Sequence, residues 1–309
     1  MNPIKGMEKM EAWSLHENDQ VRRLSSEGCR PLLPWASQLK IFREDPNPLF
    51  KILENLKSDQ SLYVRKSVAN NLNDISKDHP ELALKKAKEW IQNNSPETRW
   101  IVKHGLRTLL KSGEKKALSL FGYGSEQSFE AKDLLLKTPL VILGDNLEFE
   151  FDLLVKKKAA FRFEYALHFL KKNGTYTKKV FKISEQDLEP GEYEVDKSHG
   201  IKKINTRVYY EGLHFLEVIV NGVSVSKIPF VLWLESSPYM TYMLLTESGT
   251  IYTGVTTDFN RRYEEHSGRA KGNKGAKYTK ANAPKYLIYL EKSANRSEAQ
   301  KRESALKKL

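Results

Sequence analysis

The spacing of apolar residues changes twice along the chain and divides it into three parts. Over residues 1–136, apolar residues recur every three to four positions, which is the spacing of amphipathic helices. Over residues 137–236, they alternate with polar residues or form short apolar runs, as β-strands do. Over residues 239–309, strand and helix patterns alternate. We therefore predict a multidomain protein with α-helical repeats, then an all-β sandwich, then a small α/β domain.

The helical part is predicted to be built from repeats. Three segments align on one pattern: VRRLSSEGCR from Val21, VRKSVANNLND from Val64 and TRWIVKHGLR from Thr98. Their offsets of 43 and 34 residues are close to those of HEAT-type repeats. Prolines and polar clusters divide this part into helices over residues 19–30, 37–43, 48–57, 61–77, 80–93, 96–111 and 114–121.

The polar sides of the three aligned helices are expected to line one concave surface. A polar, largely basic surface suits a groove that follows a phosphate backbone. The alternative is an ordinary solvated face, since every such helix has a polar side. The residues concerned are Arg23, Glu27 and Arg30, then Lys66, Asn70 and Asn73, then Trp100, His104 and Arg107.

The middle part is predicted to be an immunoglobulin-like sandwich. Its expected strands include LEFEFDLLV, FRFEYALHFL, KKVFKI, TRVYY, FLEVIVNG and SVSKIPFVLWL. Turn dipeptides such as Asn173-Gly174 and Asn221-Gly222 separate them. Lysines in its loops are candidates either for phosphate contacts or for solubility, with neither favoured.

The last part is predicted to contain the strands MTYMLL, TIYTGV and KYLIYLEK. A helix is expected over TTDFNRRYEEH, beginning at Thr257 or Asp258, and another from Ser297, with Gln300 completing a capping box. From residue 240 onward there are 14 Lys and Arg against 7 Asp and Glu, a net charge of +7. This concentration of positive charge favours a phosphodiester ligand.

Composition narrows the range of partners. The net charge of +12 favours a polyanion, nucleic acid before membrane, with a generic basic surface as the alternative. The single cysteine, Cys29, excludes an internal disulfide and a Cys-rich zinc site. No signal-like core and no run of about 18 apolar residues occurs. We expect a soluble, cytoplasmic protein.

The helical part closely resembles the AlkC branch of the HEAT-like-repeat DNA alkylation repair glycosylases. The strings WSLHENDQVRRLSSEGCRPLLPW, YVRKSVANNLNDISKDHPE and TRWIVKHGLRTLLKSG carry the resemblance. It implies cleavage of the N-glycosidic bond of cationic bases such as 3-methyladenine, with Glu27 and Asp74 as active-site carboxylates. Trp35 would be an aromatic wall that attracts the cationic base, and Arg23 and Arg30 would contact DNA or pair with those carboxylates.

Other positions of the expected groove, Lys66, Trp100, His104 and Arg107, are DNA-binding candidates. Members of the family carry further helical repeats before this point, so we expect either a shortened groove or a chain that is a fragment or remodelled descendant of such a protein. Taken singly, a carboxylate near a helix end or a tryptophan at a helix junction is more often structural.

The last part resembles the GIY-YIG nuclease superfamily, specifically small members related to the nuclease half of UvrC. YTGVTTDFNRRYEEH and KGAKYTK carry the resemblance, and the first motif keeps only its tyrosine. It implies phosphodiester hydrolysis with one Mg²⁺ or Mn²⁺ held by Glu303. Tyr242 or Tyr252 would position or deprotonate water, Arg262 would neutralise the transition state, and His266 would support the base or contact phosphate. Lys271, Lys274 and Lys277 in the basic loop are further DNA-binding candidates.

Together these features predict a DNA repair protein that binds duplex DNA with alkylated or abasic lesions. It would release the base in its helical part and cut the strand in its last part. The alternative is a non-catalytic DNA-binding scaffold in which one or both active sites have decayed.

Overall fold

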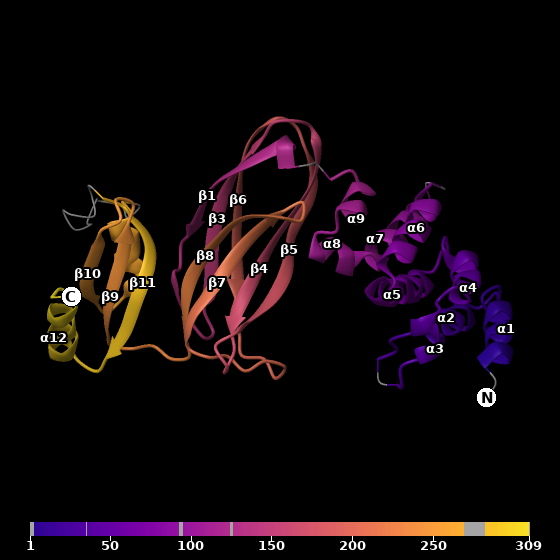
Figure 1. Ribbon diagram of the computed structural model, residues 1–309, viewed down its shortest axis with the longest axis horizontal. Coiled ribbons are helices and arrows are strands. Elements are labelled where there is room, and N and C mark those ends of the chain that lie inside the picture. The colour runs from indigo at the N-terminus through magenta and orange to yellow at the C-terminus, as the bar shows by residue number, and fades with distance from the viewer. Residues whose placement is uncertain (1–2, 35, 93–94, 124–125, 269–281, 309) are drawn as a thin grey trace. The chain divides into compact units, whose positions relative to one another are not determined.

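The computed structural model describes residues 3–34, 36–92, 95–123, 126–268 and 282–308, and it divides the chain into two units, Met1–Tyr123 and Gly124–Leu309. Helices make up the first unit, and the second holds a β-rich, immunoglobulin-like sandwich followed by a small α/β domain (Figure 1). The predicted fold class is confirmed.

The helical unit packs its apolar sides into one core. Fully buried residues of that core include Leu53, Leu72 and Ile101. One further helix, α1, precedes the predicted set. The helices are α1 (Pro3–Trp13), α2 (Asp19–Glu27), α3 (Lys40–Glu44), α4 (Leu49–Leu56), α5 (Leu62–Asp78), α6 (Pro80–Ile91), α7 (Pro96–Gly105), α8 (Arg107–Ser112) and α9 (Lys115–Ser119).

The three aligned segments correspond to α2, α5 and α7, and α5 packs against the other two. The single helix predicted over residues 96–111 is wrong, because the helix breaks at Leu106 and continues as α8. Just before the break, α7 approaches α5 so closely that a Cβ on Gly105 would lie 2.7 Å from Leu72 Cδ2. Glycine at this position therefore permits the close packing.

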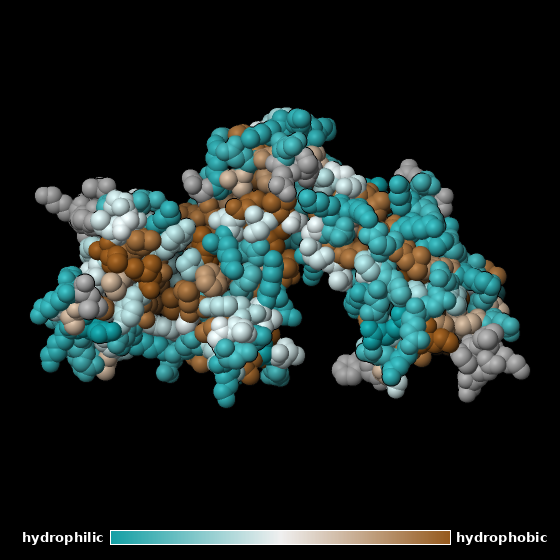
Figure 2. Space-filling model, viewed as in Figure 1, coloured by the Kyte–Doolittle hydropathy of each residue, from teal (hydrophilic) through white to brown (hydrophobic). Residues whose placement is uncertain are grey.

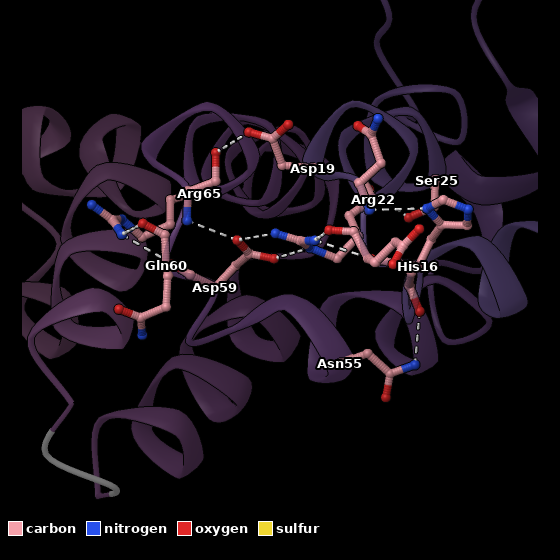
Figure 3. A network of polar contacts seen from close by, with 12 residues as sticks. His16, Asp19, Arg22, Ser25, Asn55, Asp59, Gln60 and Arg65 are labelled. Carbon is pink, nitrogen blue, oxygen red and sulfur yellow. Dashed lines mark hydrogen bonds and ion pairs between the residues drawn. The ribbon is translucent and has the colours of Figure 1, made fainter.

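A polar network fixes the start of α2 against the segment between α4 and α5 (Figure 3). Arg22 donates two hydrogen bonds to Asp59, of 2.6 and 3.1 Å, and others to the backbone oxygens of His16 and Glu17. Asp59 also accepts from the backbone N–H of Ser61 at the start of α5. Bidentate arginine pairs fix orientation as well as distance, so this network sets how α2 faces α5.

The sandwich consists of two sheets with strand orders β1-β3-β6 and β2-β8-β7-β4-β5, in which only the β2–β8 pair is parallel. Inward-facing residues of both sheets, such as Phe149 and Phe163, are fully buried between them. The strands are β1 (Phe129–Leu136), β2 (Leu140–Ile142), β3 (Asn146–Val155), β4 (Ala159–Leu170), β5 (Tyr176–Leu188), β6 (Gly191–Gly200), β7 (Gly212–Val220) and β8 (Val223–Trp233).

Three features of the sandwich differ from the prediction. Strand β1 lies within residues 1–136, which were expected to belong to the helical part. The expected strand TRVYY is irregular, because its backbone does not pair with a neighbouring strand. Arg207 stacks on Phe169 at 4.0 Å, and Val208 is exposed. The strand β6 was missed, since it is mostly polar and alternates exposed residues with a few that face the core, Tyr193, Val195 and His199. The Asn221-Gly222 turn is confirmed, with positive φ at both residues.

The α/β domain is a three-stranded antiparallel sheet, ordered β10-β9-β11, with two helices. Its elements are β9 (Tyr239–Thr246), β10 (Ile251–Thr256), α10 (Phe259–His266), β11 (Pro284–Ser293) and α12 (Arg296–Leu306). Asp258 caps α10 by accepting from Arg261 N–H at 3.1 Å, as predicted. The capping box predicted at Ser297 is wrong, because Asn295 and Glu298 form the cap two residues earlier.

Hydrophilic side chains cover much of the visible face of the helical unit (Figure 2). None of the helices in the described ranges is long and apolar enough to cross a membrane.

Candidate functional sites

A charged cluster in the helical unit is centred on Arg30. The Arg30 guanidinium donates from Nε to Asp74 Oδ2 at 2.9 Å and from Nη1 to Glu27 Oε1 at 2.6 Å. Asp74 is 2 % exposed and Arg30 8 % exposed. Burial acts to lower the pKa of Arg30, but the two carboxylate partners outweigh it and leave that pKa raised. The structure thus joins both predicted carboxylates through one buried cation.

The two carboxylates of this cluster differ in how many of their oxygens accept hydrogen bonds. Asp74 has both oxygens engaged, because Lys77 Nζ lies 3.2 Å from Oδ1. Glu27 Oε2 is buried without a hydrogen bond, and its ion pair with Arg23 Nη2 spans 3.4 Å. Glu27 also lines a pocket of about 410 Å³, together with Gln20, Val21, Arg23, Leu24 and Tyr63. Glu27 is therefore the carboxylate that borders open space.

Arg23 stacks on an aromatic ring beside that pocket. Its guanidinium carbon lies 4.1 Å from the ring centroid of Tyr63, and Nη1 donates to the Tyr63 backbone oxygen at 2.9 Å. Leu24 and Tyr63 are about half exposed, at 50 % and 51 %. The pocket mouth is thus partly apolar and cationic.

Polar residues of the second and third aligned segments form a second polar group. Trp100 and His104 stack with their ring centroids 5.0 Å apart, and Arg107 donates to Asn70 Oδ1 at 3.0 Å. Burial, and then the charges of Arg107 and Lys66, lower the pKa of His104. His104 is therefore neutral at pH 7 among cationic neighbours.

The expectation that Asn73 lines this surface is wrong. Asn73 is 3 % exposed, and its Oδ1 accepts hydrogen bonds from the backbone and hydroxyl of Thr108. Arg30, which was also expected on this surface, is buried as well. The predicted candidates Trp35, Lys271, Lys274 and Lys277 lie outside the described residues.

In the α/β domain, β9 and α10 bring Tyr242 and His266 together. The Tyr242 hydroxyl lies 2.7 Å from His266 Nε2, and both side chains are buried. Burial raises the pKa of Tyr242, while burial and the nearby Arg262 lower the pKa of His266 to about 4. At neutral pH the pair is therefore a phenol and a neutral imidazole.

The glycine of the Y-T-G motif makes room for this tyrosine. A Cβ on Gly254 of β10 would lie 2.5 Å from the Tyr242 hydroxyl oxygen, closer than real Cβ contacts. Because the Tyr242 ring is fully buried and held by His266, it cannot easily move aside. Tyr242 thus packs against the backbone of the motif at Gly254, close to Tyr252, the tyrosine of the motif itself.

Arg262 of α10 connects the two tyrosines. Burial acts to lower its pKa, but hydrogen bonds to Glu265 and to both tyrosine hydroxyls outweigh this and raise it. Glu265 Oε2 accepts from Arg262 Nη1 at 2.7 Å and holds the guanidinium in place. The ring of His266 lies edge-on to that of Tyr252, with centroids 4.7 Å apart.

These side chains and α12 enclose a pocket of about 480 Å³. Four of the predicted residues line it: Tyr242, Tyr252, Arg262 and Glu303. His266 lies behind Tyr242. Glu303 is the only carboxylate in the lining, and its Oε1 accepts from Lys307 Nζ at 2.7 Å. The structure therefore assembles residues from four elements around one polar cavity.

Sequence reasoning missed three contributors to this site. Glu265 orients Arg262, and Arg296 and Gln300 line the pocket beside Glu303. The signal was present, because 296, 300 and 303 have the i, i+4, i+7 spacing of one helix face.

Comparison with known proteins agrees with this division of the chain. Residues 4–109 match the family described as DNA alkylation repair enzyme. Residues 130–233 match the C-terminal Ig-like domain of YhaZ, and residues 238–309 match the GIY-YIG catalytic domain. These matches thus divide the chain into an alkylation-repair-type helical part, an Ig-like domain and a GIY-YIG domain.

Individual relatives are similar to different parts of the chain. The chain is 47 % identical over 212 residues to YhaZ of Bacillus subtilis, covering 68 % of this chain and 59 % of YhaZ. It is 41 % identical over 70 residues to a UPF0213 protein of Streptococcus agalactiae, covering 23 % of this chain and 75 % of the relative. A solved structure of Pseudomonas fluorescens alkylpurine DNA glycosylase AlkC, bound to DNA with an abasic site analog, matches with a TM-score of 0.71. It is 38 % identical, covering 74 % of this chain and 64 % of AlkC.

The chain thus combines a helical part similar to DNA alkylation repair proteins, a YhaZ-type Ig-like domain and a GIY-YIG domain similar to that of a UPF0213 protein. It spans about three fifths of the length of YhaZ and of AlkC.

Proposed function

We propose that the chain is a DNA repair enzyme whose C-terminal domain hydrolyses phosphodiester bonds. The observation that carries this proposal is the pocket where Tyr242, Tyr252, Arg262 and Glu303 meet. A donor-rich cavity with one carboxylate suits a phosphodiester, because arginine and phenol groups can donate to its oxygens and a carboxylate cannot.

The residues of the pocket fit one divalent cation, Mg²⁺ or Mn²⁺. Within the described ranges, no three His, Cys, Asp or Glu side chains gather into a metal-binding group. Such cations are commonly held by one or two carboxylates, with waters and substrate phosphate completing the shell, so Glu303 suffices as the protein ligand. When bound, the cation would supply positive charge that polarises the phosphate and stabilises the leaving oxygen.

The remaining side chains have distinct roles in this proposal. Arg262, held by Glu265, donates to the phosphate oxygens where negative charge develops. Tyr242 stays protonated because its pKa is raised, so it donates a hydrogen bond rather than removing a proton. Neutral His266 fixes the Tyr242 hydroxyl, and Tyr252, which is partly exposed, orients the attacking water.

Strand cleavage tests the proposal. The full chain is incubated with Mg²⁺ or Mn²⁺ and with labelled duplexes that are unmodified or contain 3-methyladenine or an abasic site. We expect cleavage that Glu303→Ala abolishes and Glu264→Ala preserves, since Glu264 is an exposed glutamate on α10 outside the pocket. Equal products from wild type and Glu303→Ala would contradict it.

We further propose that the helical unit binds alkylated DNA and releases the damaged base. The position of Glu27 favours this second activity, because a carboxylate beside a pocket can stabilise the cation that forms at the sugar. Asp74 holds Arg30, and Arg30 holds Glu27, so Asp74 would position the reacting carboxylate. Arg23, Lys66, Trp100, His104 and Arg107 would contact the strand. The AlkC relative is an alkylpurine glycosylase whose structure contains DNA, which supports the same ligand class.

Base release from 3-methyladenine duplexes tests this activity. We expect Glu27→Gln to lower the rate strongly, with exposed Glu44→Gln on α3 as the matched control. Unchanged release after both Glu27→Gln and Asp74→Asn would contradict it. Binding of the duplex with neither base release nor cleavage would favour the non-catalytic scaffold.

A further inference from the structure

The pocket of the α/β domain extends beyond the residues that the proposed hydrolysis uses. The first turn of α12 contributes Arg296 and, one turn later, Gln300. Both lie on the helix face that carries Glu303, while Ala299 and Leu306 are buried. The α12 helix is thus anchored by apolar residues and turns one polar stripe into the cavity.

Arg296 differs from the other arginines nearby in having no carboxylate partner among the described residues. Arg261 and Arg262 both pair with Glu265, and Arg302 pairs with Glu291 at 2.6 Å. Arg296 is exposed and forms neither an ion pair nor a hydrogen bond within the described part of the chain.

The carboxylates close to Arg296 are already engaged. Glu298 accepts from Ala294 N–H and from the Asn295 side chain, where it caps the helix. Glu303 pairs with Lys307. An unpaired guanidinium and an adjacent amide that face a cavity are donors for an anion supplied from outside.

We propose that Arg296 and Gln300 form a second phosphate-binding position, which holds a backbone phosphate of the DNA strand next to the one that is cut. The inference rests on the proposed nuclease function and deepens it by assigning where the flanking strand lies. Arg296 precedes Glu303 by seven residues, about 10 Å along the helix axis. With Glu303 at the phosphate that is cut, Arg296 at the other end of this polar stripe is placed to act on a neighbouring phosphate.

The position should be visible in substrate binding rather than in chemistry. We expect Arg296→Ala in the full chain to raise the KM for duplex cleavage about tenfold, with kcat nearly unchanged, because a charge-assisted phosphate contact is lost equally from ground and transition states. Gln300→Ala should raise KM by a smaller factor, and Arg296→Lys should give an intermediate value because it keeps the charge and loses the planar fork.

Salt dependence gives an independent measure without cleavage. In EDTA, the slope of log Kd for a duplex oligonucleotide against log salt should decrease by about 0.9 in Arg296→Ala, since one phosphate contact is removed. Lys301→Ala is the control, because Lys301 lies on the same helix outside this pocket and loses the same charge. It should leave both KM and slope close to wild type.

The outcomes separate the two proposals. A wild-type chain that cuts no duplex contradicts the nuclease function, and the salt slopes still decide whether Arg296 contacts phosphate. Cleavage by wild type with equal KM and slope in Arg296→Ala overturns the second phosphate position. So does a loss confined to kcat, which would assign Arg296 to the chemical step, or an equal effect of Lys301→Ala.

Discussion

The buried pair of Tyr242 and His266 makes the α/β domain sensitive to acid. The pKa of His266 is lowered from 6.5 to about 4, first by burial and then by the charge of Arg262, with Glu265 opposing weakly. In the unfolded chain His266 therefore binds a proton near pH 6.5, whereas in the folded domain it does so only near pH 4. Stability that His266 contributes at pH 7.5 is lost as pH falls through this window.

The size of the effect follows from the two pKa values. Between pH 7.5 and 5.0, a histidine with values of 6.5 unfolded and about 4 folded costs the native state about 2 kcal/mol. The full loss, reached below pH 4, is about 3 kcal/mol. Ending at pH 5.0 keeps the comparison above the carboxyl range, where Glu265 with its lowered pKa remains charged.

The assay compares wild type with His266→Gln, whose amide can still accept the Tyr242 hydroxyl and does not titrate. Hydrogen exchange of the α10 amides in the full chain, corrected for intrinsic exchange, gives the local free energy of opening. The wild-type value should fall by about 2 kcal/mol relative to the variant between pH 7.5 and 5.0. A difference that stays constant over this range would refute the burial argument, since it would mean that His266 keeps its ordinary pKa.

Three substitutions test other contacts. Gly254→Ala should displace the Tyr242 hydroxyl and lower strand cleavage about 100-fold, measured as kcat on the best duplex, while circular dichroism stays native. Gly105→Ala should cost about 1–3 kcal/mol in denaturant unfolding of the helical unit, because its methyl group would overlap Leu72; no change would mean that the helices separate easily. Arg30→Ala should cost about 3–5 kcal/mol in the same measurement, since a buried carboxylate loses its main partner, and a neutral result would show that water replaces it.

Much of the fold could be predicted, because the spacing of apolar residues in the sequence reflects the period of each helix and strand. The change from helical to alternating spacing located the three parts, and the order of Tyr242, Tyr252, Arg262 and Glu303 indicated which side chains share a pocket. Strand β6 was not predictable in this way, because few of its residues face the core.

Arg296 was missed because of one error at a helix end. Placing the cap of α12 at Ser297 left Arg296 outside the expected helix, so its alignment with Glu303 was hidden. The observed cap at Asn295 adds a turn that carries Arg296 into the pocket. Caps formed by Asn or Ser have similar local patterns, and only the packing of Ala299 and Leu306 on the sheet decides between them.

The cluster around Arg30 shows a similar limit, and it also assigns unequal roles. The i, i+4, i+7 spacing of Arg23, Glu27 and Arg30 predicted that they share a helix face, but not that Arg30 turns inward to Asp74. That contact joins residues 44 positions apart and depends on how α2 packs on α5. Asp74 accepts hydrogen bonds on both oxygens, whereas Glu27 accepts one on Oε1 only, so a ligand that bonds to Glu27 Oε2 replaces no hydrogen bond of the protein. The arrangement therefore favours Glu27 as the group that meets substrate and Asp74 as the group that holds it there.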